Sequence, residues 1–508
     1  MLEKFDLHLD TDVADGRFLI LKVISTSFFL KAKLIHIRLC RMTKYNYKTQ
    51  PYEHQRQALI QGACQNNYAY FMEMGTGKTK VSIDNVAYLH QQNKIDAVLV
   101  VAPNSVYRNW INEIETHCPV KTNIGVHKLS KSFEVKDNCL NFFLINVEAF
   151  SHDSGSKAVK DFIAFNKSRM CAIVDEATTI KNRQAKRTKR IIELCRQIIY
   201  KRILTGSPIT KSPLDLFSQC DFLSPSLLGY DNYYVFRARY SVMKQIQTNG
   251  RHVQIPIYYQ NLDELENKLK KFSYRVRKKD CLDLPDKIYQ KRYVDLSTEQ
   301  KKFYNDLKQY ARTIIEDNSV SYNNKLTEII KLQQVCNGHI VTNSGEKKVI
   351  KDSKLDELMN ILEETDGKII IWARFVYNIE NIIKKIKETY GSNSVVAIYG
   401  SVSVDQRTEN VKKFQEDDKV RFFVGNPVTG GYGLNLTKAN TVIYYNNTFD
   451  LEVRVQSEDR AHRLGQKKSV TYIDIIARGT IDEFVIKALN NKLRISADTL
   501  GEEVMKFL

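Results

Sequence analysis

The stretch Met74–Thr79, with the sequence MGTGKT, constrains the fold of this chain more than any other. A turn whose backbone N–H groups all point at a triphosphate needs φ values that glycine tolerates at close approach. A lysine at its end can place a charge on the β- and γ-phosphates, and the hydroxyl after it can bind Mg²⁺. The stretch therefore predicts a phosphate-binding loop formed by Gly75, Thr76, Gly77, Lys78 and Thr79.

The flanks of this loop predict a strand before it and a helix after it. Tyr68–Met72 is an apolar run of strand length, and Ile83, Val86 and Ala87 recur at helical spacing. The helix N-terminus would then face the phosphates. The outer glycine of the usual pattern is Met72 here, so the loop alone is also compatible with a glycine-rich turn that ends in a surface lysine.

Length and charge narrow the class of protein. A chain of 508 residues exceeds one hydrophobic core and indicates two or three domains. A formal charge of +19 favours a polyanionic partner, most often nucleic acid. A membrane partner is not indicated, because the chain has no basic amphipathic segment or lipidation signal. Nine scattered cysteines without a CxxC pair and an apolar N-terminal run too short to span a bilayer predict a soluble, intracellular protein.

Residues 1–41 differ from the rest of the chain and allow two interpretations. They mix short apolar runs with charges and lack a clear helix cap or hairpin turn. They could form a small β-rich appendage. Alternatively, the functional chain could begin at Met42, which would make them a non-native extension.

Strand-like runs alternate with helical stretches in two separate parts of the chain, which predicts two parallel α/β sheets with ligands beyond the strand carboxyl ends. In the first part the further runs are Ala97–Ala102, Phe142–Asn146, Cys171–Asp175 and Arg202–Thr205. In the second part they are Lys368–Trp372, Val395–Tyr399, Val420–Gly425, Thr441–Tyr445 and Val470–Ile476. Tyrosines interleaved with basic residues in 226–280 suit a nucleic-acid surface, although core tyrosines in a helical insertion explain them equally well.

Two carboxylates, Asp175 and Glu176, follow a predicted strand. Asp175 could hold Mg²⁺ through water, and Glu176 could polarise the attacking water as general base. The alternative is a helix N-terminus at which two acids complement the dipole. The run Lys181–Arg190 has six basic residues in ten and no acid. It is either a solvated helix face or a patch facing DNA or the second lobe.

Three further sets of residues are candidates for the nucleotide site. Gln55, on a predicted helix, could read the adenine edge with Tyr52 stacked nearby, or it could be a solvated glutamine. A second glycine-rich loop, Thr429–Thr437, contains the candidate Gly433. Gln456–Gln466 begins with the candidate Gln456 and places Arg460 and Arg463 three apart, so we expect both on one helical face. Paired arginines suit the charge on a transferring γ-phosphoryl group, although an isolated pair more often forms surface salt bridges.

Taken in order, these motifs resemble those of the Swi/Snf family of superfamily-two DNA translocases over about residues 50–490. They read PYEHQ, MGTGKT, VVAPNSVYRNW, DEAT, LTGSP, VRKKDCLDLPDK, IIIWARF, TGGYGLNL and QSEDRAHRLGQ. The resemblance implies two RecA-like lobes with helical insertions, and ATP and Mg²⁺ bound between them. It also implies that Lys78 and Thr79 bind phosphate and Mg²⁺, that Asp175 and Glu176 drive hydrolysis, that Arg460 and Arg463 act as arginine fingers, and that Gln55 recognises adenine.

The resemblance also suggests domain limits. We expect a first RecA-like lobe at 42–225, a helical insertion and linker at 226–285, a helical insertion of the second lobe at 286–345 and a second RecA-like lobe at 346–508. The chain departs from the family pattern at Thr178, which stands where DEAH motifs have histidine. We expect this change to affect the coupling of hydrolysis to the second lobe.

The expected function is ATP-dependent translocation on double-stranded DNA, including branched or protein-bound DNA, during replication, recombination or repair. The motor is expected to be monomeric, and the sequence does not indicate a protein partner. No histone-reading module is recognisable, so we expect a minimal phage or bacterial type that acts in the cytoplasm or nucleoid. The rivals are a strand-separating or branch-migrating helicase, an RNA helicase and a non-catalytic nucleic-acid-binding protein.

Overall fold

A computed structural model describes residues 45–103, 107–127, 133–166, 169–248, 251–316, 322–341, 346–429 and 434–502. The chain divides into two compact units, Met1–Tyr47 and Lys48–Leu508, and the second contains both α/β sheets. Residues 1–41 lie outside the described residues, so neither interpretation of that segment is tested.

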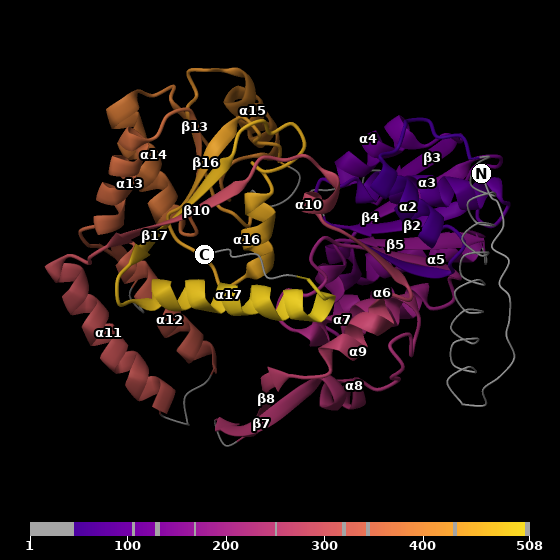
Figure 1. Cartoon of the computed structure of the whole chain (residues 1–508), viewed down its shortest axis with the longest axis horizontal. Coiled ribbons are helices and arrows are strands. Elements are labelled where there is room, and N and C mark those ends of the chain that lie inside the picture. The colour runs from indigo at the N-terminus through magenta and orange to yellow at the C-terminus, as the bar shows by residue number, and fades with distance from the viewer. Residues whose placement is uncertain are drawn as a thin grey trace, which may run out of the picture. The chain divides into compact units, whose positions relative to one another are not determined.

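The first sheet has seven strands, all parallel, in the order β3-β4-β2-β5-β6-β1-β9 (Figure 1). Its strands are β1 (Asn67–Met72), β2 (Ala97–Ala102), β3 (Thr122–Val126), β4 (Leu140–Asn146), β5 (Met170–Asp175), β6 (Tyr200–Leu204) and β9 (Ser273–Val276). Every residue of β2 and β5 is buried, as expected of central strands covered on both faces. The apolar runs of the sequence are confirmed as strands in this sheet.

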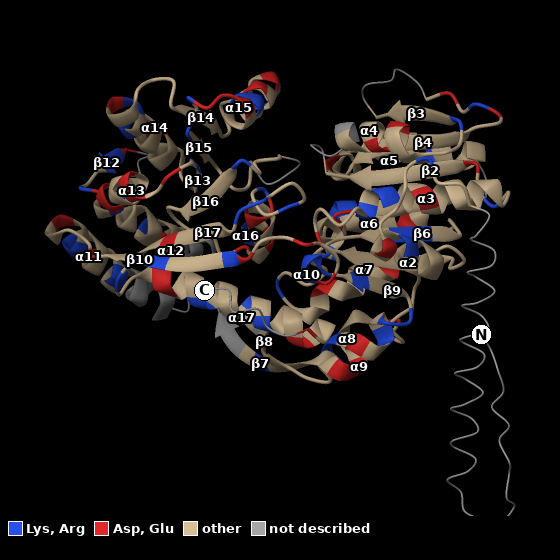
Figure 2. Cartoon of the chain, turned by 45° about the horizontal axis from the view of Figure 1, so that its top comes forward, with Lys and Arg blue, Asp and Glu red and all other residues tan. Residues whose placement is uncertain are grey.

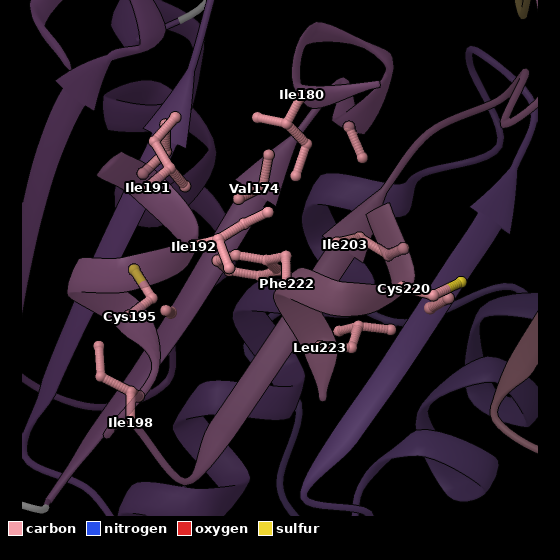
Figure 3. Close-up of a cluster of buried hydrophobic side chains, with 14 of the residues drawn as sticks. Val174, Ile180, Ile191, Ile192, Cys195, Ile198, Ile203, Cys220, Phe222 and Leu223 are labelled. Carbon is pink, nitrogen blue, oxygen red and sulfur yellow. The ribbon is translucent and has the colours of Figure 1, made fainter. Parts of the chain in front are cut away.

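Helices cover both faces of this sheet. They are α2 (Glu53–Gly62), α3 (Lys78–Gln91), α4 (Tyr107–His117), α5 (Asp153–Asn166), α6 (Lys186–Cys195) and α7 (Leu216–Leu223), with short 3₁₀ turns η1 (Val147–Ser151), η2 (Ala177–Ile180) and η3 (Pro213–Asp215). Figure 3 shows the packing between α6, α7 and the sheet, where Ile192 of α6 lies beside Phe222 of α7. This core fixes the strand ends that carry the candidate site.

A fully buried arginine ties α2 to the sheet. Arg202 on β6 donates to the carbonyl oxygens of Gly62 at 3.2 Å and Gln65 at 2.8 Å, close to the C-terminus of α2. It also donates to the Asn66 carbonyl at 2.8 Å and to Asn85 Oδ1 of α3 at 2.9 Å. A cation at a helix C-terminus complements the helix dipole, so Arg202 holds α2 against the strands that flank the phosphate loop.

The segment 226–285 is not helical throughout, which differs from the prediction. It contains α8 (Tyr233–Tyr240), a two-stranded antiparallel hairpin of β7 (Ser241–Thr248) and β8 (Arg251–Tyr259), α9 (Leu262–Leu269), β9 and α10 (Lys278–Cys281). β9 joins the first sheet beside β1. Its sequence, SYRV, lacks the apolar run that marks a central strand, because β9 lies at the sheet edge. The tyrosines of this segment are of both kinds considered above. Tyr240 is buried in the core, whereas Tyr234 is 55% exposed at the surface.

The second sheet has six parallel strands in the order β10-β17-β16-β13-β15-β14. These are β10 (Lys287–Val294), β13 (Lys368–Trp372), β14 (Val395–Ile398), β15 (Phe422–Gly425), β16 (Ala439–Tyr444) and β17 (Val470–Ala477), and a separate antiparallel pair is formed by β11 (His339–Val341) and β12 (Lys347–Val349). The expected strands of the second half are confirmed. β10 lies in the segment 286–345, for which we expected only a helical insertion.

The helices of this half are α11 (Thr298–Glu316), α12 (Tyr322–Cys336), α13 (Ser353–Glu364), α14 (Val376–Tyr390), α15 (Val404–Glu416), α16 (Leu451–Glu458) and α17 (Ile481–Leu500). α17 contacts α12 and also α9 (Figure 1). The two parallel-sheet lobes confirm the expected fold class, while the residue limits of the domains stay predictions. Among the described helices, none combines the length and apolarity needed to cross a membrane.

Candidate active site

The phosphate loop has the backbone that its sequence predicts. Gly75 and Gly77 adopt φ values of +84° and +86°, and α3 begins directly afterwards at Lys78. The Thr76 hydroxyl donates to the Glu73 carbonyl at 2.8 Å and closes the turn. The φ of Gly77 favours glycine, and a Cβ there would lie 2.2 Å from Gln55 Nε2 and displace that amide.

Gln55 packs against this loop. Its Nε2 donates to the Thr76 carbonyl at 3.2 Å, and its Oε1 accepts from the Tyr52 backbone N–H at 3.0 Å. Gln55 is only 6% exposed, which excludes the solvated glutamine considered above. The Tyr52 ring is 53% exposed and stacks on His54, with 5.8 Å between centroids. Adenine recognition by Gln55 stays a prediction.

The two carboxylates lie where β5 ends. The Oδ2 atom of Asp175 accepts from Trp110 Nε1 at 2.8 Å, and its Oδ1 accepts from the Glu176 N–H at 3.0 Å. Glu176 has a left-handed φ of +46° and precedes η2, which is a four-residue 3₁₀ turn rather than an α-helix. Glu176 Oε1 lies 3.0 Å from Lys78 Nζ, so the general base candidate contacts the lysine of the phosphate loop.

Burial and the neighbouring charges together set the pKa values of this cluster. Burial, with Glu176 beside it, raises the pKa of Asp175 to about 6. Burial disfavours the charged form of Lys78, but Glu176 and Asp175 outweigh that effect and raise the pKa of the lysine. Lys78 therefore stays charged beside the two carboxylates.

These residues fit a Mg²⁺ ion that phosphate oxygens coordinate as well. No group of three or more histidine, cysteine, aspartate or glutamate side chains in the described ranges could hold a metal ion alone. Mg²⁺ in nucleotide sites usually takes one or two protein ligands together with substrate phosphates and water. Thr79, at the start of α3, and Asp175, at the end of β5, would supply those protein ligands.

Arg460 and Arg463 do not share a helical face, so that prediction was wrong. α16 ends at Glu458, and both arginines lie in the turn that follows it. Asp459 at this helix end pairs with Lys278 at 2.6 Å, which anchors the turn outside the helix. The two arginines still converge, because each donates to the Leu434 carbonyl, at 3.4 Å from Arg460 and 3.2 Å from Arg463.

Arg463 lies next to the phosphate loop. A Cβ built on Gly75 would be 3.8 Å from the Cβ of Arg463 and 3.9 Å from the Cε of Lys278. Burial lowers the pKa of Arg463, and Asp459 and Glu113 counter that effect. Arg460 is 1% exposed and contacts its own lobe at Leu434. The structure thus brings Arg463 to the first lobe.

Residues from both lobes line one cavity of about 600 Å³. Lys78, Glu176 and Thr205 line it from the first lobe, Lys278 from the segment between the two sheets, and Gln456 and Asp459 from the second lobe. The candidate Gly433 lies outside the described residues. The cavity is of ordinary size for a small-molecule site, and it joins the phosphate loop to α16.

Sequence reasoning missed three residues of this site. Trp110 and Lys278 reach Asp175 and Gly75 from distant parts of the chain, and Glu452 accepts a hydrogen bond from Gln456 within α16. Trp110 and Lys278 lie within motifs that the sequence analysis singled out, VVAPNSVYRNW and VRKKDCLDLPDK. Trp110 could have been identified from its residue type, because a buried indole N–H needs a hydrogen-bond acceptor.

A family model described as the SNF2-related domain matches residues 33–340. The chain belongs to the SNF2-related family. A second model, the helicase conserved C-terminal domain, matches residues 351–465. The resemblance to the Swi/Snf family is therefore confirmed.

Curated relatives come from distant organisms. The ATP-dependent helicase MG018 of Mycoplasma genitalium is 28% identical over 447 residues, which cover 86% of this chain and 40% of the relative. The ISWI chromatin-remodeling complex ATPase CHR11 of Arabidopsis thaliana is 28% identical over 452 residues, covering 84% of this chain and 40% of the relative. The chain thus spans about two fifths of the length of these relatives. The solved SWI2/SNF2 ATPase core of Sulfolobus solfataricus in complex with dsDNA is 27% identical, with a TM-score of 0.42 over 90% of this chain and 95% of that chain.

Proposed function

We propose that this SNF2-related chain is an ATP-dependent translocase on double-stranded DNA. The observation that carries the proposal is one cavity lined by Lys78 and Glu176 of the first lobe and by Gln456 and Asp459 of the second. Arg463 of the second lobe lies beside the phosphate loop at Gly75. An enzyme that hydrolyses ATP between two lobes needs a phosphate cradle, a base and a cation for the developing charge. The candidates for these three roles are the phosphate loop, Glu176 and Arg463.

The residues of the first lobe divide the work of hydrolysis. The Gly75–Gly77 turn and the N-terminus of α3 bind the phosphates, and Gln55 orients the adenine. Thr79 and Asp175 would hold Mg²⁺, which would neutralise charge on the bound phosphates. Glu176 accepts a proton from the attacking water. Because Glu176 pairs with Lys78, a phosphate bound by Lys78 would compete with Glu176 for the lysine.

The second lobe completes the site. Arg463, beside Gly75, would present its guanidinium to a γ-phosphoryl group held by the loop, and Arg460 would orient the same turn through Leu434. Closure of the lobes on ATP and their separation after hydrolysis would step the chain along one DNA strand.

The charge of the chain supports a DNA partner. The net charge is +19, and Figure 2 shows lysines and arginines on both lobes, including on α6. Binding to the phosphate backbone is tolerant of sequence and weakens steeply with salt. The consequence of such movement would be displacement of bound proteins or remodelling of branched DNA in recombination and repair. A single chain would suffice as the motor, because both lobes of the site lie on it.

Steady-state ATPase rates test the proposal. They are measured without nucleic acid and with duplex DNA, single-stranded DNA or RNA, and Lys78→Ala is the control. We expect strong stimulation by duplex DNA that is lost in the variant. Stimulation by single strands or RNA alone would contradict translocation on duplex DNA and support the helicase candidates.

A strand-separating helicase is the second candidate, and one observation favours it. The β7–β8 hairpin pairs with no third strand among the described residues, and it exposes Ile255, Ile257 and Tyr258 at 39%, 57% and 56%. Apolar side chains on such an element could insert between separated bases. Unwinding of a forked duplex that is lost in Ile257→Ser would support this candidate, while duplex-stimulated ATPase activity without unwinding would count against it.

A further inference from the structure

The short turn that follows the candidate base is bonded to the second lobe. Thr178, in η2, donates its hydroxyl to Glu452 Oε1 at 2.6 Å. Lys181, directly after η2, donates Nζ to Glu452 Oε2 at 3.0 Å. Each oxygen of one carboxylate on α16 therefore binds a different residue of the first lobe. We call this set of three residues the Glu452 bridge.

The Glu452 bridge is largely shielded from solvent, unlike a surface ion pair. Thr178 is 2% exposed, and the side chains of Lys181 and Glu452 are 18% and 13% exposed. Lys181 Nζ also donates a hydrogen bond to Thr210 Oγ1 at 2.7 Å, which fixes the position of the lysine. Gln456, one turn further along α16, donates to Glu452 Oε1 at 3.3 Å. Hydrogen bonds to a charged group in such surroundings are stronger than those at an exposed surface.

The bridge connects the two halves of the active site by short covalent paths. On one side, Glu176 immediately precedes the four-residue turn that carries Thr178. On the other side, α16 extends only from Leu451 to Glu458 before the turn with Arg460 and Arg463. A shift of α16 relative to the first lobe must either break the bridge or move η2, and η2 cannot move without turning Glu176.

We propose that Thr178 and Lys181 hold Glu452 and thereby couple the position of the second lobe to the orientation of Glu176. The Thr178 hydroxyl reaches α16 from the position where DEAH motifs have histidine. These are positioning residues, because their contacts are to one another. The coupling rests on the proposed function, since it has a consequence for turnover only if Glu176 acts in ATP hydrolysis.

The holding part of the proposal is tested without catalysis. Fluorescent labels at the exposed Lys160 and Lys412 report the distance between the lobes by energy transfer in the full chain without ATP or DNA. We expect Thr178→Val and Lys181→Met each to lower the ratio of closed to open molecules about tenfold, and Thr178→Ser to restore it. Lys270→Met, which removes an exposed ion pair with Glu266 in α9, is the matched control. An unchanged ratio in both bridge variants would overturn the proposal.

The coupling part is tested by ATP turnover with and without duplex DNA. We expect Thr178→Val and Glu452→Gln each to lower the ratio of stimulated to basal kcat about tenfold, with KM for ATP within about twofold of the original chain. The double variant should be no worse than Glu452→Gln alone, because both changes break one contact. The coupling would be overturned if the losses of the two single variants multiplied in the double variant, or if Thr178→Val had no effect. Absence of turnover in the original chain would overturn the proposed function instead, and the energy-transfer ratio would still decide whether the bridge holds the lobes.

Discussion

The hydrogen bond from Trp110 to Asp175 should set the pH range in which the site binds Mg²⁺ and ATP. Asp175 has a pKa near 6 because of burial and the neighbouring Glu176, and Trp110 Nε1 at 2.8 Å opposes this rise by stabilising the carboxylate. Trp110→Phe keeps an aromatic ring in a fully buried position and removes the donor.

The size of the effect follows from the charge on the acceptor. A hydrogen bond to an ionised group contributes about 1.5–3 kcal/mol, and about 1.4 kcal/mol corresponds to one pH unit. Asp175 must be ionised to bind Mg²⁺, so activity falls as the pH drops through its pKa. In Trp110→Phe we expect this fall about one to two pH units higher than in the original chain.

The assay is the pH profile of kcat/KM for ATP with saturating duplex DNA and Mg²⁺, because kcat/KM reports groups of the free enzyme. Trp372→Phe is the matched control, since Trp372 on β13 is equally buried and its Nε1 has no hydrogen-bond partner among the described residues. An acid limb that does not move in Trp110→Phe, or that moves equally in both variants, would refute the reasoning.

Three further predictions follow from other contacts of the site and its support. Gln55→Ala removes the side chain that packs on Gly77, and we expect it to raise KM for ATP about tenfold and to weaken the preference for ATP over GTP in a competition assay. Arg463→Ala should lower kcat at least a hundredfold with little change in ATP affinity, measured by turnover and by titration of a fluorescent ATP analogue. An affinity loss equal to the loss of kcat would show that Arg463 binds the ground state. Arg202→Leu leaves the carbonyls at the end of α2 without their buried donor, and we expect a destabilisation of about 3–5 kcal/mol in urea unfolding followed by circular dichroism. A midpoint unchanged from the original chain would contradict this role of Arg202.

Central strands were predictable because burial on both faces requires a continuous apolar run. The expected limits Ala97–Ala102 and Lys368–Trp372 are the observed limits of β2 and β13. The edge strands β3, β9 and β10 were missed, because a less buried edge strand needs no continuous apolar run. β10 alternates half-buried and exposed residues over most of its length and carries three basic side chains, so its sequence has no such run.

The candidate site was predictable where one stretch of sequence carries the chemistry. The phosphate loop and the Asp175–Glu176 pair are local patterns, and their backbone agrees with the expectation. Contacts between distant segments were not predictable, because Trp110 is 65 residues from Asp175 and Glu452 is 274 residues from Thr178. The prediction that Arg460 and Arg463 share a helical face was wrong for another reason. Three-residue spacing predicts a shared face only where the helix continues, and α16 ends before Arg460.

Displacement of a triplex-forming strand from duplex DNA tests the central claim most directly, because it reports movement along the duplex without strand separation. The account predicts release of the third strand that requires ATP, persists on uniformly paired duplex and is abolished by Lys78→Ala. ATP hydrolysis stimulated by duplex DNA but without release of the third strand would contradict translocation.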